Sequence, residues 1–532
     1  MVAAGWFFEG SPVSRDQVLI SSAGSRSLDR EASDQWGLDT CALVEAAGRT
    51  CARVFMQVYG KKPRSCTVLA GTGHNAADAL VMLRALILRG CIQPSACSVF
   101  LTRFPDDNSS PFSRALLSVQ KLGVTASAWD TKNTFPATSG IYDDGIIIDG
   151  IAGTGLDGPL RGTALAMTKA VNTIGHGRAF IVSIDIPSGL FDGWQTGMPV
   201  LSAHATLAIE PQKLCLYAPS ARPHAGRILS VGGIFPGALT DQYREASLIN
   251  WKNTACRIPA IPATAHKYER GLVEIRAGSP GYAGAGRLAA MGAQAAGAGL
   301  VRLIVDPSLY PVIAPACCGI MVTPDDAGSG VRDHHRTAVL LGPGWGRGED
   351  RQRLMEQYLP DEEQGLPLIL DADAIALAGN GGIVFHGNAV LTPHTGEFAA
   401  FTGIPKETLL ANPIPVLRRY ASEWNATILF KSHVLYIASA DGRIGIIDGM
   451  NPLLAAGGSG DVLAGFCAGI ASLMYVRNKG FDGFTCACAA ASLLVEAGKS
   501  KKVAGSFVDP AQVADAAAAI AGKAWLPEVH NE

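Results

Sequence analysis

The chain alternates short apolar runs with longer helical stretches, in two separate series. A strand followed by a helix, repeated, predicts parallel strands joined by right-handed crossovers. Residues 28–58 precede the first series and are predicted to form a helix pair. The first series predicts strands at residues 67–70, 98–102, 145–149, 179–185 and 205–209.

The second series begins after a stretch that lacks a regular pattern of apolar residues. Between residues 235 and 267, Pro236, Pro259 and Pro262 break any period, which predicts a linker or crossing arm. We therefore expect two α/β domains, residues 1–245 and 246–532, which do not look like copies of each other. The second series predicts strands at residues 272–276, 301–305, 338–341, 368–370, 389–391, 427–430, 434–438 and 444–447.

Composition narrows the class of protein. The 532 residues are too many for one hydrophobic core. The 44 Lys and Arg residues nearly balance the 46 Asp and Glu residues, which argues against nucleic acid or an anionic membrane as a partner. No basic segment followed by an apolar one opens the chain, and charged or glycine residues interrupt the apolar runs. Twelve scattered cysteines without paired CxxC motifs favour a reducing compartment. We expect a soluble, cytoplasmic protein.

Residues 455–465, AAGGSGDVLAG, carry the strongest chemical signal. A glycine-rich loop that enters a helix directs free N–H groups and the positive end of the helix dipole at its ligand. An aspartate there, Asp461, can take a proton from an attacking hydroxyl while the N–H groups hold the developing negative charge. The alternative is a plain helix N-cap, because Ser and Asp both cap well.

Four more glycine-rich or polar turns follow predicted strands in the second half. Ligands of parallel sheets bind at the carboxyl ends of the strands, where these turns meet. Each turn alone fits a tight connection. Together they predict a groove of backbone and small side chains that admits phosphates and a flat ring. The turns are residues 278–285, 342–346, 371–374 and 392–397.

The ordered motifs HK-x-x-x-G, GS-x-x-Y-x-GA, GPG-x-G, DAD, LTPH-x-GE, LFK and GGSGDVLAG resemble the NAD(P)H-hydrate dehydratase family of the ribokinase-like superfamily, over residues 262 to 520. The resemblance implies an αβα domain in which Asp461 activates the hydroxyl of the hydrated nicotinamide for phosphoryl transfer. It favours ADP over ATP as donor, accompanied by Mg²⁺. It implies substrate contacts by Ala285, Gly344 and His394, and nucleotide contacts by Lys431, Ser432, His433, Val434, Leu435, Gly458, Ser459 and Gly460.

Alternatives stay open for this half. His394 could instead satisfy backbone groups in a turn, and Lys431 could be a solvated strand-end lysine. Ser432 and Leu435 stand where the family usually has glycine and threonine, which puts the nucleotide contacts of this segment in question. An ordinary sugar or pyrimidine kinase would use the same GxGD turn.

The first half resembles the NAD(P)H-hydrate epimerase family, the YjeF N-terminal domain, at residues 43–48, 71–80, 149–162 and 183–197. The resemblance implies a Rossmann-like three-layer αβα domain in which Asp185 exchanges the proton at the epimerised carbon. It also implies a K⁺ ion held by Asn75, Asp149 and Ser188, and oxygen-only ligation suits a hard cation. Substrate contacts fall on His74, Asn75, Ala76, Ala77, Asp78, Gly153, Thr154, Gly155, Leu156, Asp157, Gly158 and Pro159.

This half departs from its family at two places. The family loop reads approximately GNNGGDG, whereas residues 73–79 read GHNAADA, and His204 replaces an expected acid. Alanine is poorly tolerated where glycine serves a positive φ or a close approach. Either the epimerase works with altered loop geometry, or the domain is a non-catalytic scaffold. The fused order implies repair of NADH hydrate and NADPH hydrate by a homo-oligomeric enzyme.

Overall fold

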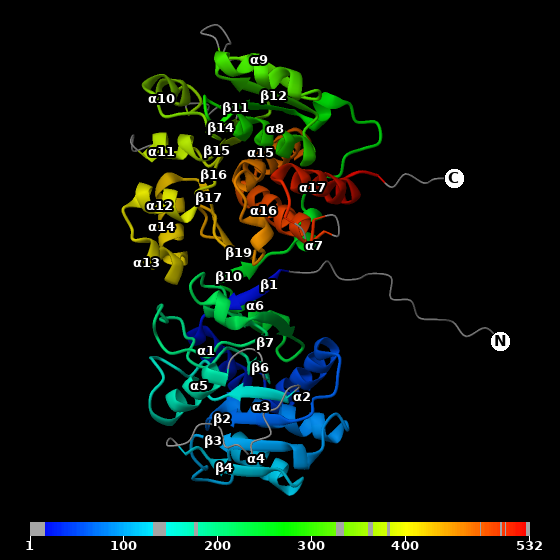
Figure 1. The fold of residues 1–532 in the computed structure, drawn as a ribbon, viewed down its shortest axis with the longest axis vertical. Coiled ribbons are helices and arrows are strands. Elements are labelled where there is room, and N and C mark those ends of the chain that lie inside the picture. The colour runs from blue at the N-terminus through cyan, green and yellow to red at the C-terminus, as the bar shows by residue number, and fades with distance from the viewer. Residues whose placement is uncertain are drawn as a thin grey trace, which may run out of the picture. The chain divides into compact units, whose positions relative to one another are not determined.

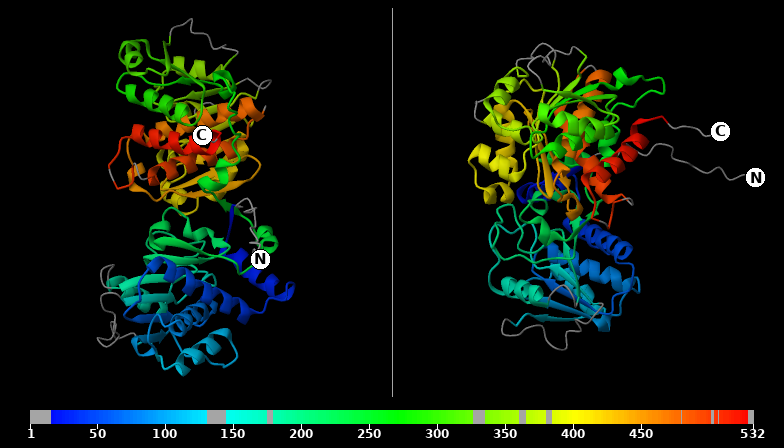
Figure 2. Two further views of the ribbon diagram at one scale, coloured as in Figure 1. Left: turned by 90° about the vertical axis from the view of Figure 1, so that its right-hand side faces the viewer. Right: turned by 45° about the horizontal axis from the view of Figure 1, so that its top comes forward.

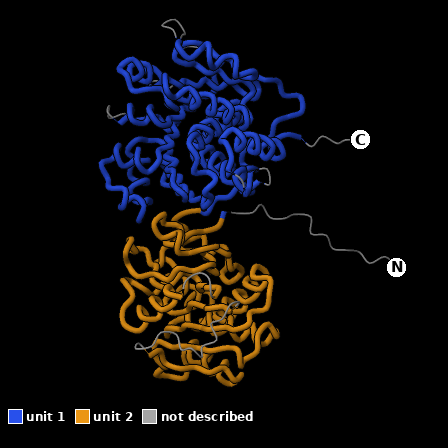
Figure 3. Tube along the Cα trace, viewed as in Figure 1, with its two compact units in different colours: residues 1–16, 248–532 blue, residues 17–247 orange. Residues whose placement is uncertain are grey.

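The computed structural model describes residues 16–130, 145–174, 179–325, 335–359, 365–379, 384–478, 480–500, 503–505 and 507–527. The chain divides into two compact units, one of residues 17–247 and one built on residues 248–532 (Figure 3). The division follows Ser247, and sequence analysis placed it after residue 245. The short strand β10 (Ala246–Leu248) lies at this division.

The first unit is built on a seven-stranded sheet in the order β4-β3-β2-β5-β6-β7-β9. Every neighbouring pair in it is parallel. The strands are β2 (Cys66–Ala70), β3 (Cys97–Leu101), β4 (Thr125–Ala128), β5 (Gly145–Gly150), β6 (Ala179–Ile184), β7 (Ala205–Ile209) and β9 (Arg227–Val231). Outside this sheet, β1 (Gln17–Ile20) pairs in parallel with β8 (Gln212–Lys213).

Both faces of this sheet are covered, which makes three layers (Figure 1). Successive residues of a strand point to opposite faces. Accordingly Ile146 and Ile148 pack with α2, α3 and α4, whereas Ile147 packs with α5. The helices are α1 (Ser22–Asp34), α2 (Thr40–Tyr59), α3 (His74–Leu88), α4 (Pro111–Lys121), α5 (Gly162–Ile174) and α6 (Gly237–Gln242).

The second unit has a mixed sheet in the order β13-β12-β11-β14-β15-β16-β17-β18-β19. Its pairs are parallel as far as β17, and β17, β18 and β19 pair antiparallel. The strands are β11 (Leu272–Arg276), β12 (Leu300–Val305), β13 (Met321–Pro324), β14 (Ala338–Leu341), β15 (Leu368–Leu370), β16 (Ala389–Leu391), β17 (Thr427–Phe430), β18 (Val434–Ala438) and β19 (Ile444–Asp448).

Helices also cover both faces of this second sheet (Figure 2). Leu340 of β14 packs with α8, α15, α16 and α17, whereas Val339 and Leu341 pack with α10 and α11. Both units are therefore three-layer αβα folds, as predicted. The helices are α7 (Trp251–Ala255), α8 (Ala283–Ala295), α9 (Tyr310–Ile313), α10 (Glu349–Glu356), α11 (Asp373–Gly379), α12 (Thr395–Thr402), α13 (Lys406–Ala411), α14 (Ile414–Trp424), α15 (Ser459–Asn478), α16 (Gly483–Lys499) and α17 (Pro510–Trp525).

The core helix α15 is apolar on all sides. Within the described residues it is the one helix with the length and hydropathy of a membrane span, with a mean hydropathy of 1.4, yet 78% of that window is buried inside the fold. A helix that is apolar all round is buried either in a large protein or in a membrane. Its packing against α8 and α16 explains its composition without a membrane.

Two predictions need correction. Residues 235–267, predicted as a linker or crossing arm, contain the division between the units but also form α6, β10 and α7. The strand predicted at residues 179–185 ends at Ile184, since Asp185 adopts a positive φ of 62° that no strand accommodates.

Candidate active sites

Asp461 lies in the first turn of α15, at the carboxyl edge of the second unit's sheet. The turn before it contains Gly458 at a φ of +98°, a left-handed conformation that favours glycine. Helix N-termini leave their first amides without intrahelical partners. The Ser459 amide donates to the Ala456 carbonyl at 3.2 Å, so the amides of Gly460 and Asp461 are the ones available to an anion. The predicted glycine-rich turn into a helix is therefore present.

Lys431 and Asp371 form a buried ion pair beside this turn. Lys431 follows β17, and its Nζ lies 2.7 Å from Oδ1 of Asp371, which follows β15. Thr392 donates to the same oxygen at 2.6 Å. A Cβ built on Gly460 would lie 3.3 Å from Nζ of Lys431, so the ammonium group is adjacent to the glycine-rich turn. Lys431 is thus not a solvated lysine.

The charges around Asp461 set its protonation. Burial, followed by repulsion from Asp371, raises the pKa of Asp461 to about 6, and Lys431 opposes that rise. Burial works against the charged form of Lys431, but Asp371 and Glu397 outweigh it and raise the pKa of the ammonium group. A carboxyl group whose pKa is close to neutral can take and release protons at physiological pH.

His394 caps α12 through one ring nitrogen and lies close to Glu397 through the other. Its Nδ1 accepts hydrogen bonds from the amides of Gly396 at 2.9 Å and Glu397 at 3.1 Å, so the ring proton is on Nε2. Glu397 returns the interaction by accepting from the His394 amide at 2.8 Å. Nε2 lies 3.3 Å from Oε1 of Glu397, and because the side chain is 58% exposed, a ligand can reach this nitrogen in competition with Glu397. The capping role and a ligand role are therefore compatible.

Ala285 and Gly344 lie side by side on two neighbouring turns. A Cβ built on Gly344 would lie 3.2 Å from Cβ of Ala285 and 2.6 Å from Cβ of Tyr282, and the φ of Gly344 is +54°. Ser279 donates to the carbonyl of Gly344 at 2.9 Å, which ties the two turns together. A larger residue at position 344 would separate them.

A cavity of about 500 Å³ opens beside α12 in the second unit. Its described lining includes His394 and Glu397 but not Asp461. Arg347 also lines it, 63% exposed and paired with Asp373 at 2.7 Å. The cavity therefore marks space next to His394, away from Asp461.

The segment after Lys431 contributes few free side chains. Val434 and Leu435 lie on β18, 0% and 6% exposed, and pair with β19. The hydroxyl of Ser432 accepts from the Val434 amide at 3.2 Å. A ligand can meet Val434 and Leu435 only through their backbone. His433 is exposed between them and Lys431.

In the first unit, Asp185 is held by a lysine that sequence analysis did not identify. Nζ of Lys213 lies 2.8 Å from Oδ1 of Asp185, and the Ile209 amide donates to the same oxygen at 3.2 Å. Lys213 is 4% exposed and also donates to the Ile209 carbonyl at 3.1 Å. The only available signal was its position shortly after the predicted strand 205–209. These donors fix the position of the Asp185 carboxyl group.

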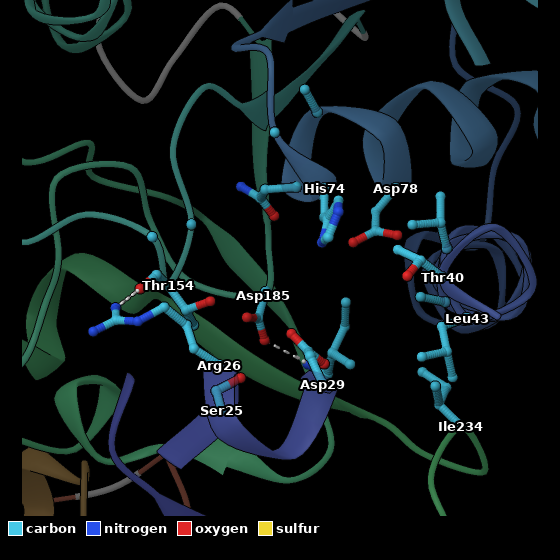
Figure 4. Close-up of a pocket in the computed structure, with 18 of the residues that line it drawn as sticks. Ser25, Arg26, Asp29, Thr40, Leu43, His74, Asp78, Thr154, Asp185 and Ile234 are labelled. Atoms are coloured by element: carbon cyan, nitrogen blue, oxygen red, sulfur yellow. Dashed lines mark hydrogen bonds between the residues drawn. The ribbon is translucent and has the colours of Figure 1, made fainter. Parts of the chain in front are cut away.

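A cavity of about 690 Å³ lies in front of Asp185 (Figure 4). Its described lining does not include Ala77, Asp157, Gly158 or Pro159. Asp157 instead pairs with Arg26 of α1 at 3.3 Å. Helix α1 also contributes Ser25, Asp29 and Arg30 to the wall, none of which the sequence indicated. The predicted contacts that do line it are His74, Asn75, Ala76, Asp78, Gly153, Thr154, Gly155 and Leu156.

The alanine-substituted loop is the beginning of a regular helix. Residues 74–88 form α3, and none of the alanines at 76, 77 and 79 has a positive φ. Alanine is the best helix former, so these substitutions carry no backbone strain. A Cβ built on Gly150 would lie 2.6 Å from Cβ of Ala79, so glycine in β5 provides the space.

Asn75, Asp149 and Ser188 meet around the carbonyl of Ala152. Nδ2 of Asn75 donates to that carbonyl at 3.0 Å, and the Ser188 hydroxyl donates to it at 3.2 Å. The Asp149 carboxylate is fully buried and accepts from the Ser183 hydroxyl at 2.8 Å and the Ser188 amide at 2.9 Å. Oδ1 of Asn75 is buried and has no hydrogen-bond partner among the described residues.

His204, which replaces an acid expected from the family, has a structural role. Its Nδ1 accepts from the Ile181 amide at 3.0 Å, and its ring stacks on Phe180 at 5.1 Å. It is not among the residues that line the cavity of the first unit. This substitution therefore leaves the walls of the candidate site unchanged.

Comparison with known families gives one match for each unit. Residues 273–518 match the family described as NAD(P)H-hydrate dehydratase. Residues 40–215 match the family described as YjeF-related protein N-terminus. Helix α1, which lines the first cavity, precedes the matched range.

Relatives share both halves in the same order. A bifunctional NAD(P)H-hydrate repair enzyme of Moorella thermoacetica is 31% identical over 476 residues, covering 85% of this chain and 88% of that protein. The enzyme of the same name from Gloeobacter violaceus is 33% identical, covering 81% and 84%. A Bacillus subtilis ADP/ATP-dependent NAD(P)H-hydrate dehydratase, co-crystallised with ATP and Mg²⁺, is 24% identical with a TM-score of 0.46, covering 52% of this chain and 99% of that one.

Proposed function

The chain belongs to the bifunctional NAD(P)H-hydrate repair enzymes, and from that premise we propose how its two sites divide the work. The first unit epimerises the R and S hydrates at the cavity in front of Asp185. The second unit dehydrates the S hydrate at Asp461, with ADP as the favoured phosphoryl donor and ATP as the alternative. A homo-oligomeric state and a cytoplasmic location belong to the same proposal.

At the second site, Asp461 takes the proton from the hydroxyl of the hydrated ring as that oxygen attacks the terminal phosphoryl group. The phosphate ester then eliminates phosphate and a ring proton, which restores the reduced nicotinamide and leaves AMP when ADP is the donor. The pKa of about 6 at Asp461 carries this assignment, because the group is charged at neutral pH and poised to accept a proton.

The surrounding groups supply electrostatic support and contacts. The turn of Gly458, Ser459 and Gly460 faces the nucleotide phosphates, with the amide of Gly460 as a donor, and the ammonium of Lys431 adds positive charge beside it. Ala285, Gly344 and Nε2–H of His394 contact the hydrate. These roles rest on position in the fold and on the family motifs.

Mg²⁺ accompanies the nucleotide in this proposal. Among the residues that the structure describes, no group of three or more His, Cys, Asp or Glu side chains could hold a metal ion. The side chains present do not form a Mg²⁺ site of their own, and Mg²⁺ commonly stays on phosphates and water. No step is assigned to it.

At the first site, Asp185 is the base of the epimerase, held in place by Lys213 and the Ile209 amide. The residues around Ala152 fit K⁺, because the unpaired Oδ1 of Asn75 and the oxygens of Asp149 and Ser188 are hard ligands. A bound K⁺ would offset the buried charge of Asp149. The substrate loop at residues 153–156 continues directly from this cluster.

The test of the proposal is recovery of NADH from separately prepared R and S hydrates with ADP. Recovery from both epimers supports two working sites. Release of a stable phosphate ester would indicate a kinase instead, and recovery from the S hydrate alone would indicate a first unit without catalysis.

A further inference from the structure

Asp78 is a buried acid that lacks a partner in the cavity of the first unit. It lies in α3, it is 7% exposed, and it lines the same cavity as Asp185. Among the described residues, its Oδ1 is buried without any hydrogen-bond partner. Burying an unpaired carboxylate is costly, so the neutral acid is the favoured form.

The environments of Asp78 and Asp185 differ in a way that separates their roles. One oxygen of Asp185 accepts from an ammonium group and an amide, whereas Oδ1 of Asp78 has no such donor among the described residues. Figure 4 shows both carboxyl groups, with that of Asp29, around the same space. Two acids with opposed environments are the usual arrangement of a general acid and a general base.

Charged groups around Asp78 come from several elements. Burial first, then the negative charges of Asp185 and Asp29, raise the pKa of Asp78 well above its usual value, and Lys213 opposes this. The thiol of Cys51 on α2 also interacts with Asp78, and its own pKa is raised. Asp78 therefore keeps its proton to a higher pH than an ordinary aspartic acid does.

The chemistry of the hydrate offers a role to such a pair. The epimerised carbon carries both a hydroxyl group and the ring nitrogen, so it can invert without loss of its hydrogen. A base takes the hydroxyl proton, the carbon–oxygen double bond forms, and the bond from carbon to ring nitrogen breaks. An acid gives a proton to the departing nitrogen. Reversal on the opposite face of the carbonyl returns both protons and yields the other epimer.

We propose that Asp78 is the acid of this reaction and a second catalytic residue of the epimerase. It protonates the ring nitrogen while Asp185 takes the hydroxyl proton, and the two exchange these protons on ring closure. The inference deepens the proposed epimerase function and rests on it. It departs from proton exchange at the carbon itself, which the family resemblance implied for Asp185.

The test uses the full-length chain without nucleotide, so that dehydration does not consume the hydrate. Conversion of pure S hydrate to R hydrate is followed by chromatography for wild type, Asp78→Asn, Asp185→Asn and the control Asp106→Asn. Asp106 is on the surface, 82% exposed and paired with Arg103. Dehydration of S hydrate with ADP, measured on the same samples, reports whether each variant is folded.

Asp78→Asn should slow epimerisation by about 100-fold or more, the usual contribution of a general acid, with the KM for the hydrate little changed. Dehydration and Asp106→Asn should match wild type. Epimerisation by Asp78→Asn at close to the wild-type rate would overturn the role of Asp78. A wild type that does not epimerise, or an active Asp185→Asn, would instead overturn the proposed function.

Two further measurements distinguish a catalytic role of Asp78 from a purely structural one. The wild-type rate should fall on the alkaline side as Asp78 ionises, and the residual rate of Asp78→Asn should lack that fall. In deuterium oxide, the recovered epimers should carry no deuterium at the epimerised carbon. Deuterium at that carbon, or an alkaline fall that persists in Asp78→Asn, would contradict the mechanism.

Discussion

Nζ of Lys431 lies 2.7 Å from Oδ1 of Asp371 and so joins the carboxyl ends of β17 and β15. Asp371 is buried, 2% exposed, and Lys431 is 17% exposed, in a position where the motif alone suggests a direct nucleotide contact. Asp371 raises the pKa of Asp461 and Lys431 lowers it. The pair therefore adjusts the base of the dehydratase as well as adding positive charge beside the phosphate-binding turn.

The pH dependence of dehydration should report Asp461. Its pKa is raised to about 6, and only the carboxylate can accept a proton, so kcat on S hydrate should rise with pH through about 6 and then level. Rates measured with saturating hydrate and ADP between about pH 5 and 8 test this. A rate that stays constant over that range would remove Asp461 as the titrating base.

The charged carboxylate of Asp461 should also lower the stability of the fold. A carboxyl group whose folded pKa is raised above 3.8 to about 6 destabilises the fold above pH 6, and this cost disappears below about pH 4. Asp461→Asn should therefore increase the free energy of unfolding by roughly 1–3 kcal/mol at pH 8 and by less at pH 5. Denaturant unfolding at both pH values measures this difference, and an equal gain at each would contradict it.

Lys431→Met should act on two properties together. Loss of the ammonium group removes a charge that lowers the pKa of Asp461, so the pH–rate limb should move to higher pH. ADP affinity should weaken, since positive charge beside Gly460 is lost. Lys523→Met, on the exposed surface of α17, is the matched control. A limb that stays in place in Lys431→Met would mean that the pair does not tune Asp461.

The core strands were predictable because each is a short apolar run between turn residues. Strands β11, β14 and β18 have the bounds that the sequence predicted. The edge strand β4, TASA, was missed because its residues are largely exposed and polar, and it is defined by pairing with β3. Edge pairing depends on tertiary contacts that local periodicity does not contain.

The site residues also divide into those that local sequence indicates and those that depend on tertiary contacts. Asp461 and Asp185 follow strands or open a helix, so local sequence indicated them. Lys213 and Asp29 reach the first cavity through folding of distant segments, which no local pattern encodes. Whether alanines 76, 77 and 79 distort the loop could not be predicted either, because this depends on the helical conformation of α3 and on Gly150 in β5.

Gly150→Ala tests how the alanine-substituted loop is accommodated. The added Cβ would lie 2.6 Å from Cβ of Ala79, so the variant should lose roughly 1–3 kcal/mol of stability and most epimerase activity. Adding Ala79→Gly removes the clashing methyl and should restore part of both, because the added Cβ would still lie 3.0 Å from the carbonyl oxygen of Asn75. Thermal unfolding and nucleotide-free epimerisation measure the pair. No recovery in the double variant would mean that α3 does not depend on this contact.

Two sites on one chain are tested most directly by NADH recovery from separate R and S hydrates with ADP. Wild type should recover both epimers, Asp185→Asn should recover the S hydrate at the normal rate and the R hydrate only at the spontaneous rate, and Asp461→Asn should recover neither. An Asp461→Asn variant that recovers S hydrate at the wild-type rate, or an Asp185→Asn variant that loses S-hydrate recovery, would contradict the account.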